Sequence, residues 1–201
     1  MEHVLVVNRE QLEQTLPRCP FITDEENIRK GLDFILANYT FEDRGKAEYD
    51  TSLKQIIPYV VIRQANRFYM LKRLKKQMET RLHNMLSLGV GGHINPGESM
   101  DGSILKAGLY RELREEVFVE EVHRLTSIGI LNENTQEVSN FHTGIVFLLE
   151  VSGEVRVLET EKMEGQWVSM DTLTQLYEFF ESWSQIIIQF LQKKPEFLQN
   201  R

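Results

Sequence analysis

Three glutamates recur at spacings that place them on one side of a helix. Glu112, Glu115 and Glu116 stand at positions i, i+3 and i+4 of one short segment, and residues so spaced are neighbours on a helical surface. Three like charges this close repel one another, so an isolated helix gains nothing from them. Carboxylate oxygens are the ligands that Mg²⁺ and Mn²⁺ prefer. The spacing therefore predicts a divalent-metal site, and a solvated helix face is the alternative interpretation.

Neighbouring residues are suited to support such a site. Arg111 precedes Glu115 by four residues and can pair with its carboxylate, which would fix the carboxylate rotamer. Gly91 and Gly92 follow an apolar segment and can turn the backbone sharply, so a main-chain carbonyl there could join the metal ligands. Glu98 could reach back toward Arg111 or toward the groups around the metal.

His93 and Arg73 are candidate substrate contacts. His93 directly follows the two glycines and could touch the substrate or a supporting carboxylate, although a capping or packed histidine fits the position equally well. Arg73 belongs to a basic run that could bind a substrate phosphate, although such runs are more often solvated loops. The run comprises Lys72, Arg73, Lys75, Lys76 and Arg81.

The carboxylates need a helix and a sheet to position them. Apolar residues repeat every four positions beside them, at Leu105, Leu109, Leu113 and Val117, which predicts a helix over 104–119 whose apolar stripe is buried against a sheet. Strands are predicted over 56–63, 67–73, the apolar part of 83–99, 122–133, 139–151 and 166–170, with a loop or short helix over 71–83. A closing helix is predicted from Asp171, as its cap, to about Lys194.

The first 50 residues form a separate region in this interpretation. A strand over 3–7, a helix over 8–16 capped by Asn8 and a helix over 25–39 precede a polar seam near 40–53. We therefore expect an N-terminal extension over 1–50 and a catalytic domain over 51–201. The extension could form an extra layer, a lid or a dimer contact.

Composition narrows the class of protein. The chain has 201 residues, a formal net charge of −7 and one cysteine, Cys19, so an intramolecular disulfide is excluded and a reducing cytoplasm is expected. No apolar run approaches the roughly 18 residues of a membrane helix, and the N-terminus lacks the pattern of a secretory signal. The acidic balance argues against a nucleic-acid backbone as partner. Aromatic residues in the last helix hint at a homodimer surface.

The order of these features resembles the Nudix box of the Nudix hydrolases. That box runs as Gly, five residues, Glu, seven residues, Arg-Glu, an aliphatic residue, any residue, Glu-Glu, any residue, Gly and an aliphatic residue. The matching residues are Gly92, Glu98, Arg111, Glu112, Leu113, Glu115, Glu116 and Val119. Two positions depart from it: five extra residues precede Arg111, and Phe118 stands where the box has glycine, so a different helix exit is expected.

The resemblance implies a fold and an activity. The fold would be α/β, an α/β/α sandwich around a mixed sheet, extended at the N-terminus by an α/β region. The activity would be hydrolysis of a diphosphate linkage, in a nucleoside diphosphate derivative or a related small molecule, by water activated by Mg²⁺ or Mn²⁺.

The resemblance also implies residue roles. Glu115 and Glu116 would be the main metal ligands, helped by the Gly91 carbonyl, and Glu112 would be a further ligand or the general base. Glu161 occupies a place where some members carry an additional ligand or base, and Glu164 competes for that role. For both of these, a solvated carboxylate in a turn is the alternative.

Two other functions remain open on the sequence. Some proteins of this fold bind a ligand as sensors without hydrolysing it, but such a sensor has little reason to keep clustered carboxylates. Isomerases of isoprenoid diphosphates share the fold, but Cys19 lies in the extension, so the cleft region has no cysteine.

Overall fold

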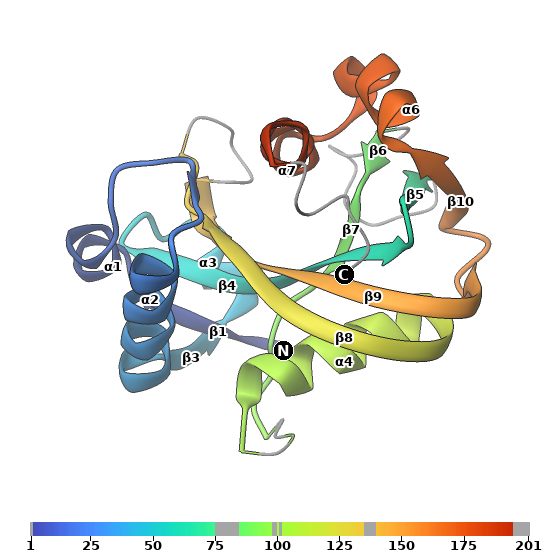
Figure 1. The fold of residues 1–201 in the computed structure, drawn as a ribbon. Helices are drawn as coiled ribbons and strands as arrows, with labels where there is room; N and C mark the ends of the chain where they lie inside the picture. Colours follow the sequence, from blue (N-terminus) through green and yellow to red (C-terminus); the bar gives the residue numbers. More distant parts are fainter. Residues whose placement is uncertain (1, 75–84, 98–99, 101, 135–139, 195–201) are drawn as a thin grey trace. The chain divides into compact units, whose positions relative to one another are not determined.

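The computed structural model describes residues 2–74, 85–97, 100, 102–134 and 140–194 (Figure 1). Its strands are β1 (His3–Asn8), β2 (Phe21–Ile22), β3 (Thr40–Asp43), β4 (Leu53–Gln64), β5 (Arg67–Arg73), β6 (Leu86–Ser87), β7 (Gly89–Gly91), β8 (Val117–Leu131), β9 (His142–Val157) and β10 (Met163–Ser169). Its helices are α1 (Arg9–Thr15), α2 (Glu25–Asn38), α3 (Arg44–Ala47), α4 (Ile104–Glu116), α6 (Met170–Gln175), the 3₁₀ turn η2 (Tyr177–Phe179) and α7 (Ser182–Lys193).

The strands form a mixed sheet accompanied by helices, so the predicted α/β class is confirmed. The chain divides into two compact units, which do not follow the expected boundary at residue 50. Unit 1 comprises 1–59, 91–111 and 127–147, and unit 2 comprises 60–90, 112–126 and 148–201. Five elements, β4, β7, β8, β9 and α4, contribute residues to both units. The division into 1–50 and 51–201 stays a prediction.

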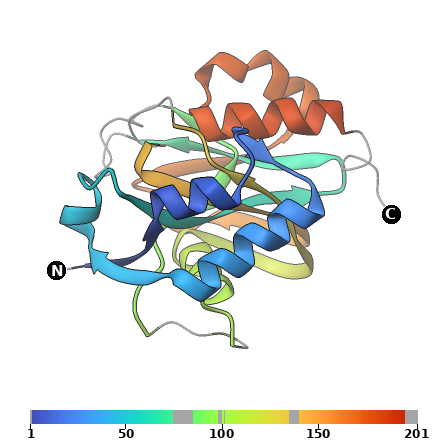
Figure 2. The same ribbon diagram turned by 90° about the vertical axis from the view of Figure 1, so that its left-hand side faces the viewer.

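In unit 1, α1 and α2 begin at the residues that the sequence indicated. The side chain of Asn8 accepts from the Gln11 amide and starts α1, while Asp24 accepts from the Asn27 amide and starts α2. The two helices lie side by side beside β1 (Figure 2). Strand β1 pairs antiparallel with β3 and with β4, and its four central residues are buried. The predicted helices over 8–16 and 25–39 are confirmed.

In unit 2, a hairpin and a further strand run antiparallel. Arg63 of β4 faces Phe68 of β5, and β5 pairs along its whole length with β10. Ala65, in the turn between β4 and β5, has a φ of 54° and is the one non-glycine residue with positive φ in the part of the chain that is described. The predicted strand over 67–73 is confirmed, and the one over 166–170 begins earlier, at Met163.

Helix α4 is shorter than predicted. It ends at Glu116, and β8 begins at the next residue, whereas the sequence predicted a helix to residue 119. Val117, Phe118 and Val119 are β-branched or aromatic, and such residues favour a strand once a sheet neighbour is present. Phe118 therefore lies in extended backbone, and the different helix exit expected from it is confirmed. The apolar stripe is buried as predicted, at Leu105, Leu109 and Leu113 of α4 and at Val117, the first residue of β8.

The single closing helix predicted from Asp171 is wrong. Ser169, which precedes Asp171 in the chain, caps α6, and Glu181 caps a separate helix, α7. Phe180, which is 1% exposed, lies between η2 and α7 in extended backbone and forms a parallel bridge with Leu86. The main-chain contacts of this segment with β6 interrupt the helical pattern that the sequence shows.

Two further observations bear on the predictions. No helix within the described ranges is long and apolar enough to cross a membrane. The loop or short helix predicted over 71–83, apart from the end of β5 and Leu74, lies outside the described residues, as does Glu98.

Candidate active site

Four charged residues of the motif, Arg111, Glu112, Glu115 and Glu116, occupy the last two turns of α4. Glu112 and Glu116 are half-buried, whereas Glu115 is exposed. The helix predicted for them is confirmed, and their spacing puts them on neighbouring positions of its surface. Arg111 belongs to unit 1 and the three glutamates to unit 2.

The carboxyl group of Glu116 has an unusual environment. Its pKa is raised to about 7, chiefly by burial and also by the negative charges of Glu112 and Glu159, while the guanidinium of Arg73 opposes the shift. Within the described part of the chain, this carboxyl group makes no hydrogen bond or ion pair that would compensate its desolvation. Burial and neighbouring negative charge both destabilise the ionised form of this carboxyl group, so a bound cation would stabilise that form strongly.

The turn after β9 brings a further carboxylate toward Glu116. The main-chain amide of Leu158 donates to the carbonyl oxygen of Glu116 over 2.8 Å, which ties the turn to the end of α4. At its other end, the amide of Leu74 donates to the carbonyl oxygen of Lys162 over 2.7 Å. Glu159, half-buried, pairs with the Lys162 ammonium at 2.5 Å within the turn.

The sequence reasoning missed Glu159 and Lys162. It placed the carboxylate of this region at Glu161 or Glu164, both of which are exposed. The missed signal is the alternation of buried Val155 and Val157 with exposed neighbours, which extends β9 to residue 157. With that strand end, Glu159 becomes the second residue of the turn.

Arg73 is a predicted substrate contact whose charge acts on a motif carboxylate. It ends β5 opposite Met163, the residue that follows the turn. Its positive charge acts on Glu116, as the lowering of the Glu116 pKa by Arg73 shows. An arginine there is suited to pair with a phosphate oxygen.

In unit 1, Arg111 holds the segment that follows β7. Its Nη2 donates to the carbonyl oxygen of His93 over 2.6 Å and to Oδ1 of Asn95 over 2.9 Å. Asn95 in turn donates through Nδ2 to the carbonyl oxygen of His3, and the amide of Leu5 donates to the carbonyl oxygen of Ile94, both over 2.9 Å. The segment is thus fastened to α4 on one side and to β1 on the other. The predicted pairing of Arg111 with Glu115 stays a prediction.

His93 is held as a neutral ring. Its Nε2 lies 2.9 Å from the side-chain amide of the buried Gln55, within hydrogen-bond distance. Burial lowers the pKa of His93 to about 3, and the positive charge of Arg44 lowers it further. His93 therefore brings no positive charge to a phosphate at neutral pH, and its contribution is the fixed hydrogen bond to Gln55.

Gly91 ends β7 where a side chain has little room. A Cβ atom there would lie 3.0 Å from the carbonyl oxygen of Pro58 and 3.1 Å from Cδ2 of Tyr59. Backbone that close can yield only by a few tenths of an ångström, so a side chain is disfavoured at this position. The role of its carbonyl as a metal ligand stays a prediction.

The carboxylate oxygens of Glu112, Glu115 and Glu116 are chemically suited to a divalent metal, although these side chains do not form a closed group of ligands among the described residues. In the ranges that the structure describes, no group of three or more His, Cys, Asp or Glu side chains is close enough to hold a metal ion. Glu116 nevertheless offers an oxygen donor without a hydrogen-bond partner there, close enough to Glu112 and Glu159 for their charges to raise its pKa. Hard oxygen donors of this kind suit Mg²⁺ or Mn²⁺.

Comparison with known proteins gives consistent matches. Residues 54–190 match the family model of the NUDIX domain. Protein YmaB of Bacillus subtilis (strain 168) is 33% identical over 201 residues, which covers 95% of this chain and 98% of YmaB. The crystal structure of Tm1382, assigned to the Nudix hydrolases, is 32% identical with a TM-score of 0.81, covering 96% of this chain and 99% of Tm1382. DR0079 from Deinococcus radiodurans shares the fold at 13% identity and a TM-score of 0.55, covering 92% of this chain and 97% of DR0079.

Proposed function

Because this chain belongs to the Nudix family and is an enzyme of the pyrophosphohydrolase type, we propose that it hydrolyses a diphosphate linkage with Mg²⁺ or Mn²⁺ as cofactor. The substrate class is a nucleoside diphosphate derivative or a related small molecule. The observation that carries the proposal is the half-desolvated Glu116 carboxyl group, whose pKa of about 7 reflects burial beside two further carboxylates. A bound divalent metal neutralises phosphate charge and lowers the pKa of the attacking water.

The side chains of the chain have distinct tasks in this proposal. Glu115 and Glu116 hold the metal, and Arg73 pairs with a phosphate oxygen of the substrate. Glu112 is a further ligand or the base that takes the proton from the attacking water. Arg111 keeps the segment around His93 in place through its two hydrogen bonds.

The turn carboxylate that takes part is expected to be Glu159. Replacing Glu159 by glutamine should lower kcat about tenfold to a hundredfold, because it removes a charge that acts on Glu116. Replacing the exposed Glu161 in the same way should change kcat less than about threefold. Steady-state kinetics at saturating Mn²⁺ compares the two variants. The reverse order of effects would assign the role to Glu161, as the family resemblance suggested.

Metal affinity is expected to rise with pH around neutrality. Glu116 must lose its proton to bind a cation, and its pKa of about 7 lies well above the ordinary 4.5, so at pH 6 most molecules carry a proton there. The dissociation constant for Mn²⁺ should therefore fall about tenfold between pH 6 and pH 8, whereas in Glu116→Gln that slope should be lost. Titration calorimetry gives both slopes. A constant that does not change with pH in the wild type would contradict the assignment.

The activity itself is tested with a substrate panel. Purified protein is incubated with nucleoside diphosphate sugars, dinucleoside polyphosphates, coenzymes and nucleoside triphosphates, in Mg²⁺ or in Mn²⁺, and released phosphate, pyrophosphate or nucleoside monophosphate is measured. Turnover that is lost in EDTA and in Glu116→Gln, but kept in the exposed control Glu178→Gln, supports the proposal. Binding of a panel member without turnover would favour the ligand sensor instead.

The proposal also includes the cellular compartment, the partners and the oligomeric state of the enzyme. We place it in the cytoplasm, because its one cysteine fits a reducing compartment, and we expect no nucleic-acid backbone as partner, because the net charge is −7. Phe179, which is 63% exposed in unit 2, is a candidate contact of a homodimer. Light scattering after size exclusion tests the dimer, and a mass equal to one chain would exclude it.

A further inference from the structure

The segment of residues 91–95 is attached to the N-terminal strand β1 within unit 1. The amide of Leu5 donates to the carbonyl oxygen of Ile94 over 2.9 Å. The carbonyl oxygen of His3 accepts from Nδ2 of Asn95, also over 2.9 Å. His3 and Leu5 are two residues apart on one strand, so their main-chain groups point to the same edge of β1. The segment therefore lies along one edge of β1.

Strand β1 is a firm support for this segment. Its four central residues are at most 1% exposed, and it pairs with both β3 and β4. Val4 and Val6 also pack with the buried Ala47 of α3. Ile94 is fully buried at the point of attachment. Buried and paired backbone of this kind opens rarely, so the segment is attached to one of the most stable parts of unit 1.

The side chain of Asn95 joins β1 to Arg111. Its Oδ1 accepts from Nη2 of Arg111 over 2.9 Å, while its Nδ2 donates to His3. An amide can do both because it carries an acceptor and a donor, whereas an ionised carboxylate only accepts. Pro96 follows and restricts the backbone of Asn95 to extended conformations. Asn95 is therefore suited to link the two elements in one fixed arrangement.

Glu2 and Arg44 extend these contacts into the rest of the N-terminal region. Nη1 of Arg44 donates to Oε2 of Glu2 over 2.8 Å, and Oε1 of Glu2 accepts from Asn95 over 3.4 Å. Although burial would raise the pKa of Glu2, hydrogen bonds from Arg44 and Asn95 hold it below its ordinary 4.5. Glu2 is exposed, so this ion pair contributes less than the bond between Asn95 and His3.

We propose that the N-terminal strand is a working part of the active site, with Asn95 as the positioning residue that joins it to Arg111 and to the segment 91–95. The inference rests on the proposed function, because it gives this attachment the task of keeping the Gly91 carbonyl and His93 in place for hydrolysis. Small displacements of such groups lower the rate strongly. This role for the first 50 residues requires neither a lid movement nor a second copy of the chain.

The variant Asn95→Asp tests the inference in the full chain. It keeps an acceptor for Arg111 and removes the donor to His3. On the best substrate of the panel, kcat should fall about tenfold while KM stays within about twofold. Hydrogen exchange of the metal-free protein, followed by mass spectrometry, should become about tenfold faster over residues 91–97. Asn95→Leu removes both bonds and should lower kcat about a hundredfold.

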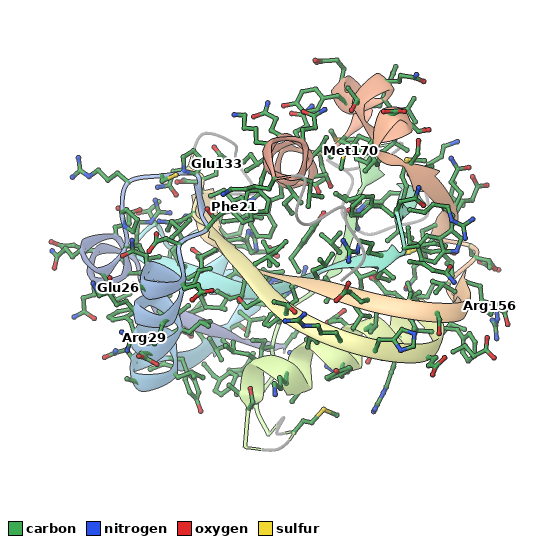
Figure 3. All side chains as sticks on the ribbon, viewed as in Figure 1. Phe21, Glu26, Arg29, Glu133, Arg156 and Met170 are labelled. Carbon is green, nitrogen blue, oxygen red and sulfur yellow. The ribbon has the colours of Figure 1, made fainter. Side chains whose placement is uncertain are left out.

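Helix α2, whose Glu26 and Arg29 are labelled in Figure 3, offers a matched control. Asn38 is exposed on this helix, and its Nδ2 donates to the carbonyl oxygen of Phe34 over 2.8 Å. Asn38→Asp therefore makes the same exchange of a donor for an acceptor away from the segment. It should leave kcat and the exchange of residues 91–97 within about twofold of the wild type.

Two readouts keep this inference separate from the proposed function. Unaltered exchange over residues 91–97 in Asn95→Asp would overturn the inference, whether or not the wild type turns over a substrate. Faster exchange with a wild-type kcat would also overturn it, because the attachment would then not serve catalysis. A raised KM with unchanged kcat would make Asn95 a substrate contact and not a positioning residue. A wild type without turnover on any substrate would instead count against the proposed function.

Discussion

Replacing Glu116 by glutamine is expected to remove turnover and to stabilise the metal-free protein. Turnover should fall about a thousandfold or more, because losing this ligand weakens the hold on a metal ion that would supply several kcal/mol of charge stabilisation in the transition state. The stability effect has the opposite sign. Burial raises the pKa of Glu116 to about 7 from an unfolded value of 4.5, so the folded protein holds this proton more tightly than the unfolded chain does.

The pH dependence of this stability effect determines the pH at which it should be measured. Stability is lost as the pH rises from 4.5 through 7, and above 7 the folded protein carries the full cost of a half-buried charge. That cost is about 2 kcal/mol after allowing for partial exposure, and glutamine removes it. In EDTA at pH 8, thermal unfolding of Glu116→Gln should begin about 4–8 °C above that of the wild type.

A pH comparison provides the control for this stability effect. At pH 4.5 the wild-type carboxyl group is protonated in the folded protein, so the two melting temperatures should lie much closer together. The same change at the exposed Glu178 should leave the melting temperature unaltered at both pH values. Equal melting temperatures of Glu116→Gln and wild type at pH 8 would mean that the ionised carboxylate is not destabilising in the metal-free protein.

Replacing Arg111 by alanine is expected to lower kcat about a hundredfold with little change in KM. The guanidinium is the donor that fastens His93 and Asn95 to α4, at 2.6 and 2.9 Å, and losing it frees the segment that follows Gly91. A displacement of about 1 Å in catalytic groups can cost that factor. Arg111→Lys should recover only part of the rate, because an ammonium lacks the planar fork of donors.

Arg114 offers a matched control on the same helix. It is exposed, and Arg114→Ala removes the same charge three residues farther along α4. Its kcat should stay within about twofold of the wild type. If Arg111→Ala and Arg114→Ala lowered kcat alike, the effect would follow from helix charge and the fastening role of Arg111 would be disproved.

Local patterns predicted the parts of the fold that depend on neighbouring residues. The four-residue repeat of Leu105, Leu109 and Leu113 indicated the buried side of α4, and Asn8 indicated the start of α1. Both signals are contained within a single element. The spacing of Glu112, Glu115 and Glu116 likewise indicated that these carboxylates share the surface of α4.

Contacts between residues far apart in the chain determine the features of the fold that local sequence patterns did not predict. Helix α4 ends at Glu116 because the following residues are taken into β8, and the closing helix is split where Phe180 meets Leu86. The alternation at Val155 and Val157 indicates where the turn of Glu159 begins, but only the hydrogen bond from the Leu158 amide to the Glu116 carbonyl shows that this turn lies at the end of α4. The secondary-structure propensities of neighbouring residues do not indicate such long-range pairings.

The way this turn is attached determines which of its atoms a substitution can change. Leu158 and Lys162 are held through main-chain atoms, and the amides of Lys162 and Met163 both donate to the carbonyl oxygen of Glu159 over 2.8 and 3.1 Å. Main-chain bonds of this kind survive most substitutions. The side chains at 159–161 can therefore be exchanged while the main chain of the turn stays anchored at the end of α4 and at Leu74.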